Sequence, residues 1–442
     1  MPDDARQVSL ARPLPAAVRP GRGLLLPLAG RVASGGSAPH VMLGAGDAVV
    51  RADASNMPVI EGGAVHADAF WGFVPLGPAR EAAGVAVRVG DRDLGEIMLE
   101  PEPPPVPHAV DPGLVAICLA THDPPPELLA AQIASLLAQT HEHWVCVVCD
   151  DASSPAGIET VRGAIAGDAR FTLLEGRERA GAYRTFERCL RHVPAAARAV
   201  AFCDQDDRWH PGKLAELLAV LTPGVMLSHS DVRLVDERGT VRSPTYWTDR
   251  ERSEDRIGDL LLANTVTGMA SLFRRELLDA VLPFPAPLGP DALHDHWVAL
   301  VAAATGRIAY VDRPLADYVQ HDANLLGHRS RRVERSAAPR WERWQGSYCD
   351  LLLPRRALAA TLLLRCTDTL DDAQRRSLQR IAAPRPATLA AAALRGAPRG
   401  RRTLGHEWRM LRGALWAARA RAHPGAAVAL RRELADLMAP IS

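Results

Sequence analysis

Three aspartates lie within four positions of the stretch VAFCDQDDRWHPGKL, residues 200–214. Asp204, Asp206 and Asp207 follow an apolar run that predicts a buried strand, and Pro211 suits the first turn of a predicted helix. Like charges this close repel, so another group must compensate them. Asp204 and Asp206 face the same side of an extended chain, and paired hard oxygens suit Mg²⁺ or Mn²⁺ carrying a phosphate. The alternative for an isolated D-x-D is a solvated acidic turn before the helix.

The composition is that of a globular protein with a sizeable core. The chain has 442 residues, which suggests two or three domains, and 48% of them are hydrophobic and 23% charged. The net charge of +1 does not point to nucleic acid as a partner. Lys213 is the only lysine, so arginine carries nearly all the positive charge, which we attribute to coding bias.

The cysteines do not predict a metal site or a disulfide framework. Cys146 and Cys149 form a C-x-x-C pair, but the segment HWVCVVCD reads as a strand, where positions three apart face opposite sides. We therefore expect buried thiols in a reducing compartment. The seven cysteines are Cys118, Cys146, Cys149, Cys189, Cys203, Cys349 and Cys366.

The sequence carries no recognised targeting segment. The N-terminus, MPDDARQVSLARP, lacks the apolar core of a signal peptide, and no apolar run is long enough to span a bilayer. We expect a cytoplasmic protein.

Four regions differ in their patterns. Residues 1–100 carry short apolar or alternating runs between glycine-rich turns and predict a small β domain. Residues 101–113, PEPPPVPHAVDPG, predict a stiff proline-rich linker. Residues 114–330 alternate strands and helices, which predicts an α/β domain with a mostly parallel sheet and helices on both faces. Residues 331–442 predict an arginine-rich helical region.

The alternating elements of the α/β region can be placed by residue number. The predicted strands are 115–120, 144–150, 171–175 and 199–204, and the predicted helices are 126–139, 156–167, 182–193 and 211–221.

One C-terminal segment, residues 403–422, predicts an amphipathic helix. Leu404, Trp408, Leu411 and Leu415 form a stripe at helical spacing, with arginines around it. Such a helix lies on an anionic membrane surface or packs on the preceding domain with its basic face in solvent.

Polar residues end three of the predicted strands of the α/β region. The sequences THDPPP, DDASSP and DQDDRW follow the strands that end near residues 120, 150 and 203. Ligands bind beyond the carboxyl ends of the strands in open parallel sheets, so we expect these three ends to line one crevice.

The motif order resembles a known family. The chain is similar to the family 2 glycosyltransferases of the GT-A fold in the order of its motifs. These motifs are VAICLATHD, LLAAQIASLLAQT, VCVVCDDASSP, GAYRTFERCL, FCDQDDRW, HDHW and YVQHDAN. Within that family it looks most like the bacterial rhamnosyltransferase-type members. The resemblance covers about residues 113–330 and implies a GT-A sheet in this region.

The resemblance implies a nucleotide-sugar site at the first strand ends. Thr121, His122 and Asp123 stand where the family holds the nucleotide. Asp151 matches the carboxylate that accepts a hydrogen bond from a pyrimidine base, and an arginine at Arg184 would pair with the diphosphate. The structural alternative for Asp151 is a residue in a capped turn. For Arg184 it is a surface arginine on an amphipathic helix.

The D-x-D of the family matches Asp204 and Asp206. Asp206 would be the firmer metal ligand, and Asp204 would be shared between metal and nucleotide-sugar. Gln205, Asp207 and Trp209 match the DQDD-x-W form of the rhamnosyltransferase-like members: Gln205 belongs to the nucleotide-sugar site, and Asp207 and Trp209 to the sugar pocket.

Asp295, at the start of the apolar helix LHDHWVALVAAATG, matches the catalytic base of the family. An inverting transfer needs one carboxylate to take the proton from the acceptor hydroxyl as it attacks the anomeric carbon. His294 and Trp297 flank Asp295, and these two residues with Gly268 are expected in the acceptor and sugar pocket. A carboxylate that merely stabilises the helix N-terminus is the alternative for Asp295.

His321 matches a histidine of the family that ligates the metal or contacts the diphosphate, although a lone histidine is more often structural. Two positions depart from the family pattern. Val319 stands where arginine is common, which removes a candidate phosphate contact, and Ala152 replaces the usual glycine after the aspartate pair.

The function that the resemblance implies is a metal-dependent inverting glycosyltransferase with Mg²⁺ or Mn²⁺. The donor would be a nucleotide-sugar, with dTDP-L-rhamnose as one candidate, and the acceptor a bacterial surface glycan or lipid-linked oligosaccharide. Such an acceptor would place the protein at the inner face of the cell membrane, in peripheral contact through its C-terminal helices. Two alternatives remain: a non-catalytic carbohydrate-binding or scaffold protein, and a nucleotidyltransferase, whose glycine-rich, lysine-bearing loop we do not find.

Overall fold

The structure is a computed structural model. It describes residues 8–10, 13–32, 42–51, 59–61, 64–66, 69–103, 109–246, 256–287, 293–321, 351–383 and 408–415, and the single residues Ser347 and His406.

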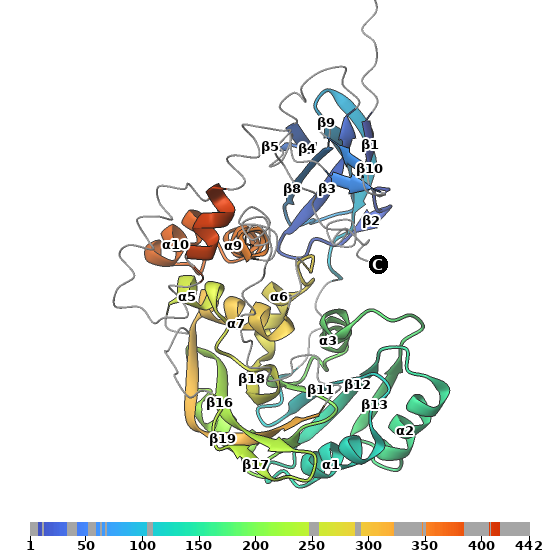
Figure 1. Ribbon diagram of the computed structural model, residues 1–442, viewed down its shortest axis with the longest axis vertical. Helices are drawn as coiled ribbons and strands as arrows, with labels where there is room; N and C mark the ends of the chain where they lie inside the picture. The colour runs from blue at the N-terminus through green and yellow to red at the C-terminus, as the bar shows by residue number, and fades with distance from the viewer. Residues whose placement is uncertain are drawn as a thin grey trace, which may run out of the picture.

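The N-terminal segment is built from short β-strands (Figure 1). Leu24, Leu26 and Leu28 alternate along β3 and pack with Val74 and Val87 into a separate hydrophobic core. The strands are β1 (Val8–Leu10), β2 (Ala17–Val18), β3 (Leu24–Val32), β4 (Met42–Ala45), β5 (Ala48–Arg51), β6 (Val59–Glu61), β7 (Ala64–His66), β8 (Ala69–Leu76), β9 (Ala83–Val89) and β10 (Arg92–Leu99). They form sheets in the orders β1-β3-β8, β2-β10-β9-β4-β5 and β6-β7.

A larger sheet, β13-β12-β11-β14-β18-β16-β19-β15 with β17 paired to β16, carries the α/β region. Its first four strands are parallel, β18 is antiparallel to both neighbours, and β16 and β19 are again parallel, so the sheet is mixed beyond β14. The strands are β11 (Val115–Thr121), β12 (Trp144–Asp150), β13 (Phe171–Glu175), β14 (Ala199–Cys203), β15 (Arg208–Trp209), β16 (Val225–Asp236), β17 (Val241–Ser243), β18 (Ser271–Arg274) and β19 (Arg307–Gln320).

Helices cover both faces of this sheet, which explains why its central parallel strands β11, β12 and β14 are almost wholly apolar. Ile117 and Leu119 of β11 belong to the core shared with α1 and α4, whereas Cys118 faces the core shared with α3 and α7. The helices are α1 (Pro126–Leu137), α2 (Pro155–Ile165), α3 (Ala182–Arg191), α4 (Lys213–Val220), α5 (Ile257–Leu262), η1 (Gly268–Ala270), η2 (Arg275–Leu277), α6 (Leu278–Val281), α7 (His294–Thr305), α9 (Leu353–Arg365) and α10 (Asp372–Ala382).

The cysteines follow the strand pattern predicted for them. The six in the described part of the chain are buried and free, and Cys349 lies outside that part. Cys146 packs in one face of the sheet and Cys149 in the other, as the alternation of strand side chains requires.

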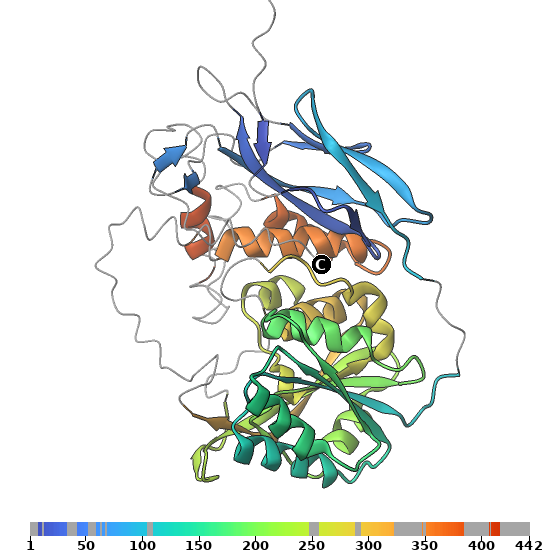
Figure 2. The same cartoon turned by 90° about the vertical axis from the view of Figure 1, so that its right-hand side faces the viewer.

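Helix α9 lies between the N-terminal strands and the α/β region (Figure 2). Arg365, at its end, donates from Nε to the carbonyl of Gly23 at 2.6 Å and from Nη1 to the carbonyls of Ala280, Val281 and Pro283 at 3.1, 3.1 and 2.7 Å. One buried guanidinium therefore joins three segments that are far apart in sequence.

The C-terminal stretch 408–415 is helical, but its buried face differs from the predicted stripe. Met410, Leu411 and Ala414 are buried, whereas Trp408 and Leu415 are 40% and 39% exposed. Leu404, the first residue of the predicted stripe, lies outside the described residues. None of the helices in the described ranges is long and apolar enough to cross a membrane.

Candidate active site

The polar ends of β11, β12 and β14 meet at one edge of the sheet. Thr121 pairs in register with Asp150, and Leu119 with Cys203, so the D-x-D loop that follows β14 adjoins both other strand ends. Parallel pairing brings the three predicted motifs together, as the open-sheet rule requires.

Thr121 is the buried last residue of β11, at the edge of the site. It is 2% exposed, and its hydroxyl donates to Asp150 Oδ1 at 3.0 Å. Asp150 also accepts from the backbone N–H of Ser153 at 2.8 Å. The hydroxyl of Thr121 thus satisfies a buried carboxylate, and the nucleotide contact of Thr121 stays a prediction.

The loops after β11 and β12 are hydrogen-bonded to each other. Asp123 Oδ1 accepts from the backbone N–H and the hydroxyl of Ser154 at 2.8 and 2.7 Å, and these bonds lower the pKa of Asp123. Ser153 Oγ accepts from the backbone N–H of Asp123 at 2.8 Å. Asp123 and Ala152 adopt positive φ angles of 39° and 54°, which side-chain-bearing residues rarely occupy.

Gln205 connects the D-x-D loop to the end of β11. Its Oε1 accepts from the backbone N–H of His122 at 2.8 Å, and its Nε2 donates to the carbonyl of the same residue at 3.2 Å. The ring Nδ1 of His122 lies 2.9 Å from the carbonyl oxygen of Asp151. His122 and Gln205 thus fix the three strand ends relative to one another.

Asp151 does not present a free carboxylate. It is 4% exposed, and its two oxygens accept from the backbone N–H groups of Ala180 and Gly181 at 2.7 and 2.8 Å. Gly181 precedes α3, so Asp151 holds the loop that leads into this helix. Each oxygen accepts one backbone N–H and keeps a second lone pair, so the contact of Asp151 with a pyrimidine base stays a prediction.

Arg184 is also bound within the protein. It forms an ion pair with the carboxylate of Glu187, which also accepts from Arg191 Nη2 at 2.8 Å and from the backbone N–H of Phe284 at 3.0 Å. Glu187 is 5% exposed, and a buried carboxylate needs such partners. The charge of Arg184 thus compensates Glu187, and its pairing with a diphosphate stays a prediction.

Asp204, Asp206 and Asp295 form a crowded acidic cluster. Burial, followed by the charges of Asp206 and Asp295, raises the pKa of Asp204 to about 7, and Lys213 opposes this rise. Asp206 Oδ2 lies 2.8 Å from Nε2 of His321, whose side chain is only 5% exposed. The structure thus brings the D-x-D, the predicted base and the predicted histidine ligand together.

Asp207 lies under the D-x-D loop and not in a pocket. It is fully buried, and its Oδ1 accepts from the backbone N–H of Val319 at 3.0 Å. Lys213 is fully buried too, with its ammonium 2.9 Å from the ring centre of Trp209. Asp207 Oδ2 and Lys213 Nζ have no hydrogen-bond partner within the described ranges.

The predicted pocket roles of Asp207 and Trp209 are therefore corrected. Both side chains are internal, and Trp209 is 4% exposed in the core beside α4. Burial lowers the pKa of Lys213, while Cys203, Asp207 and Asp204 oppose this effect. The only lysine of the chain thus lies beneath the acidic cluster, a place that the sequence did not predict.

Asp295 occupies the first turn of α7 and is held by three donors. Its Oδ1 accepts from Asn264 Nδ2 at 3.1 Å and from the backbone N–H of His296 at 2.6 Å, and its Oδ2 accepts from the backbone N–H of Gly268 at 2.9 Å. Burial raises the pKa of Asp295 to about 6, and these hydrogen bonds limit the rise. Gly268 adjoins Asp295 through its backbone, and its place in the acceptor and sugar pocket stays a prediction.

His294 adjoins the cluster as a neutral ring. It stacks on Phe186 with ring centroids 3.8 Å apart and meets Phe202 edge-on at 4.5 Å. Burial lowers the pKa of His294 to about 3, so the ring carries no charge at neutral pH. No described contact places it against a sugar, so its pocket role stays a prediction.

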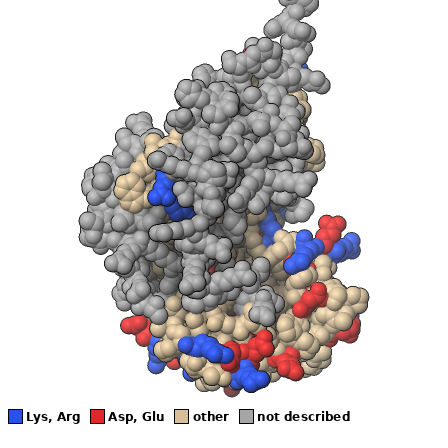
Figure 3. Space-filling model, viewed as in Figure 1, with Lys and Arg blue, Asp and Glu red and all other residues tan. Residues whose placement is uncertain are grey.

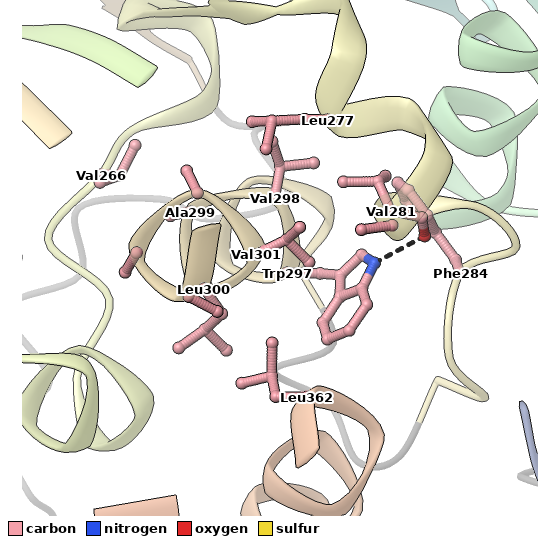
Figure 4. Packing of buried hydrophobic residues seen from close by; sticks show 14 of the residues in the cluster. Val266, Leu277, Val281, Phe284, Trp297, Val298, Ala299, Leu300, Val301 and Leu362 are labelled. Atoms are coloured by element: carbon pink, nitrogen blue, oxygen red, sulfur yellow. Dashed lines mark hydrogen bonds between the residues drawn. The ribbon is translucent and has the colours of Figure 1, made fainter. Parts of the chain in front are cut away.

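Trp297 is a core residue, which corrects its predicted place in the pocket. It is 1% exposed, and its indole N–H donates to the carbonyl of Val281 at 2.9 Å. Figure 4 shows its ring between the α7 side chains, Val281, Phe284 and Leu362 of α9. Asp295 faces the site and Trp297 faces the core, because residues two apart in sequence lie on different sides of a helix.

The donor set suits a divalent metal only together with a substrate. In the described part of the chain, no three His, Cys, Asp or Glu side chains form a group that would hold a metal ion. Asp204 and Asp206 supply hard oxygens, and the like charges that raise the pKa of Asp204 would be relieved by a cation. The residues therefore fit a two-carboxylate site completed by water and diphosphate oxygens.

The surface of the α/β region carries charges of both signs. Figure 3 shows Lys and Arg interspersed with Asp and Glu over the part of this face that the structure describes. The charge concentrated at the site is therefore a local feature, set by the strand ends.

Part of the chain is similar to known proteins. The family described as "Glycosyl transferase family 2" matches residues 116–282. The matched segment contains the D-x-D but not Asp295 or His321, which the fold brings to it.

Three curated relatives share part of the chain. It is 27% identical over 135 residues to the Escherichia coli protein "UDP-Glc:alpha-D-GlcNAc-diphosphoundecaprenol beta-1,3-glucosyltransferase WfgD", covering 30% of this chain and 51% of that one. It is 27% identical over 208 residues to an uncharacterized Nostoc glycosyltransferase, covering 44% and 62%. It is 31% identical over 86 residues to the putative teichuronic acid biosynthesis glycosyltransferase TuaG of Bacillus subtilis, covering 20% and 33%. The matches span about half the length of these relatives.

Solved structures are similar at lower identity. Residues 1–349 of S. aureus TarS, in complex with UDP-GlcNAc, align with a TM-score of 0.43 at 14% identity, over 70% of this chain and 91% of that one. The mannosyltransferase PcManGT of Pyrobaculum calidifontis, in complex with GDP-Man and Mn²⁺, aligns with a TM-score of 0.39 at 20% identity, over 72% and 90%.

We predict that Ala152→Gly stabilises the protein. Ala152 has a φ of 54°, and removing its Cβ from a left-handed conformation is worth about 1 kcal/mol. Urea denaturation would measure the gain. Ala134→Gly, on the exposed side of α1, is the matched control and should cost about 1 kcal/mol. A loss of stability in Ala152→Gly would show that the loop does not hold this conformation.

We predict that Asp204→Asn is more stable than the wild type at pH 8 without metal. The pKa of Asp204 is about 7 in the folded chain and near 3.8 when unfolded, so the folded state binds the proton more tightly. Its contribution to stability is therefore lost as pH rises from about 4 to 7, and asparagine avoids that loss. The expected gain at pH 8 is about 1–3 kcal/mol, shrinking at pH 5.5.

Denaturation in EDTA at pH 5.5, 7 and 8 checks this prediction. Asp168→Asn is a control of opposite sign, because a hydrogen bond from Arg170 lowers the pKa of Asp168 and the variant should lose stability at pH 8. Equal stability of the wild type and Asp204→Asn at all three pH values would contradict the raised pKa of Asp204 in the folded protein.

Proposed function

Because residues 116–282 match the family described as "Glycosyl transferase family 2", we propose that this protein is a metal-dependent inverting glycosyltransferase. The observation that carries the proposal is the acidic cluster of Asp204, Asp206 and Asp295 at the carboxyl ends of β11, β12 and β14. Asp204 and Asp206 suit the donor side of a transfer reaction, and Asp295 suits its acceptor side.

Asp295 acts as the general base. With its pKa at about 6, it is largely ionised at neutral pH and still basic enough to accept a proton from a hydroxyl. The acceptor oxygen forms its bond to the anomeric carbon as the bond from that carbon to the diphosphate breaks. The proton goes to Asp295 and the electron pair leaves with the nucleoside diphosphate, so attack opposite the leaving group inverts the configuration.

Asp204 and Asp206 hold the divalent metal, Mg²⁺ or Mn²⁺. When bound, the metal stabilises negative charge on the leaving diphosphate. His321 lies beside Asp206 and orients it through the 2.8 Å contact, or joins the ligands once the diphosphate is present. Gln205 and His122 keep the D-x-D loop and the end of β11 in register around the donor.

The donor is a nucleotide-sugar, and rhamnose is the sugar that the DQDD-x-W form of the motif favours. Other donor sugars must also be tested, because the relative WfgD is named as a UDP-glucose enzyme and TuaG is assigned to teichuronic acid synthesis. These names support a bacterial surface glycan or a lipid-linked oligosaccharide as the acceptor. We place the protein in the cytoplasm, where nucleotide-sugars are made.

Membrane contact through the C-terminal helices stays a prediction. Its support is the exposed face of residues 408–415, where Trp408 and Leu415 flank Arg412. A tryptophan and a leucine next to a cation are typical of helices that lie in a membrane interface.

A donor panel tests the proposed function. Hydrolysis and binding of dTDP-L-rhamnose, UDP-glucose, UDP-GlcNAc and GDP-mannose are measured with Mg²⁺, Mn²⁺ or EDTA, for the wild type and Asp206→Ala. We expect one preferred donor, activity abolished by EDTA, and a loss of about 100-fold or more in the variant. Asp279→Ala, on the exposed face of α6, is the control and should retain activity.

Failure of every nucleotide-sugar to bind, with or without metal, would refute the catalytic assignment. The carbohydrate-binding alternative would then lead, and binding of the acceptor glycan without any donor would be its signature.

A further inference from the structure

Asn264 contacts the proposed base from a neighbouring loop. It follows α5 and precedes η1, and its Nδ2 donates to Asp295 Oδ1 at 3.1 Å across a sequence separation of 31 residues. No motif singled out this contact, because it depends on the packing of α5 against α7.

The side chain of Asn264 is itself fixed in orientation. Its Oδ1 accepts from the backbone N–H of Val266 at 3.0 Å, and its Nδ2 donates to the carbonyl of Val266 at 2.9 Å. Exchanging the amide N and O would break both bonds and the bond to Asp295, so the network determines the assignment. Val266 is 2% exposed and packs near Ala299 of α7 (Figure 4), which anchors the loop.

The hydrogen bonds distinguish the two oxygens of Asp295. Among the residues that the structure describes, Oδ1 accepts from two groups, Asn264 and the backbone N–H of His296, whereas Oδ2 accepts from one, the backbone N–H of Gly268. A carboxylate oxygen has two lone pairs, so Oδ1 is saturated and Oδ2 keeps one free. The free lone pair is the one that can take a proton from another molecule.

We propose that Asn264 is a positioning residue that saturates Oδ1 of Asp295 and thereby leaves Oδ2 as the proton-accepting atom. This inference rests on the proposed function, because it concerns the same base. Asn264 does not touch the reacting atoms in this account. It holds the carboxylate plane, stabilises the anion and prevents Oδ1 from competing for the acceptor hydroxyl.

The groups around Asp295 allow its titration to be interpreted. Asp204, after β14, faces it across the site, and the charge of Asp295 raises the pKa of Asp204. His294 and His296 on α7 both have their pKa lowered to about 3 by burial, and are neutral. From the other packed helices, Asp259 of α5 pairs with Arg256, Arg355 of α9 acts on His296, and Arg365 lies over Trp297.

Substitution of Asn264 should shift the pH dependence of transfer. Loss of the amide donor in Asn264→Ala raises the pKa of Asp295, so the acidic limb of the kcat profile moves to higher pH. Asn264→Asp places a second carboxylate against the first and should move the limb further, by about one pH unit or more. Donor KM should change little, because Asn264 makes no contact with the D-x-D loop.

The experiment measures kcat and donor KM from pH 5 to 9 for the wild type, Asn264→Ala, Asn264→Asp and Thr267→Val. Thr267 lies in the same loop and serves as the matched control, with an unchanged profile expected. Thermal melts confirm that each variant is folded. ¹³C NMR titration of the aspartate carboxyls, with the Asp295 signal assigned from Asp295→Asn, gives the pKa of Asp295 without relying on activity.

An upward shift of the acidic limb in Asn264→Ala, matched by the NMR titration, supports the inference. An unchanged profile and titration overturn it, and so does a uniform loss of kcat with a lowered melting temperature, which would mark a merely structural role. If the Asp295 titration shifts in the Asn264 variants but the wild type transfers no sugar, the proposed function is refuted. The assignment of Oδ2 as the proton-accepting atom is then refuted with it.

Discussion

Repulsion among Asp204, Asp206 and Asp295 is the constraint on which the rest of the site depends. Burial and like charges raise the pKa of Asp204 to about 7, so the cluster does not carry its full charge without a cation. The surroundings keep the carboxylates in place despite this repulsion: Gln205 ties the D-x-D loop to β11, Lys213 lies beneath it, and three donors hold Asp295. We interpret the strained, charged edge as a site completed by a substrate that brings the opposite charge.

The packing away from the site fixes the base as firmly as the loops do. Helix α7 carries Asp295 on one side and buries Trp297 on the other, where its indole donates to Val281. Arg365 of α9 donates to the same carbonyl and to that of Gly23 in the N-terminal strands. The N-terminal and C-terminal segments therefore support the helix that positions the base, although none of their described residues belongs to the acidic cluster.

The sequence predicted the elements and the edge at which the motifs meet, because apolar strands alternating with helices and polar strand ends are local signals. It did not predict which polar side chains the protein uses internally. Thr121, Asp151 and Arg184 occupy the expected positions, yet each is engaged by a buried partner. Trp209 and Trp297 are aromatic residues near the site in sequence but in the core in space. The role of Asn264 depends on a contact 31 residues away, which no spacing reveals.

Calorimetry of Mn²⁺ binding tests the central claim most directly. The metal-free protein is titrated at pH 6.5 in two buffers of different ionisation enthalpy, with and without dTDP, UDP or GDP, so that protons released on binding can be counted. The account predicts that Mn²⁺ expels a proton from the cluster, up to about one per site, and that one nucleoside diphosphate strengthens Mn²⁺ binding. Absence of Mn²⁺ binding, or binding without proton release that is indifferent to every nucleotide, would contradict it.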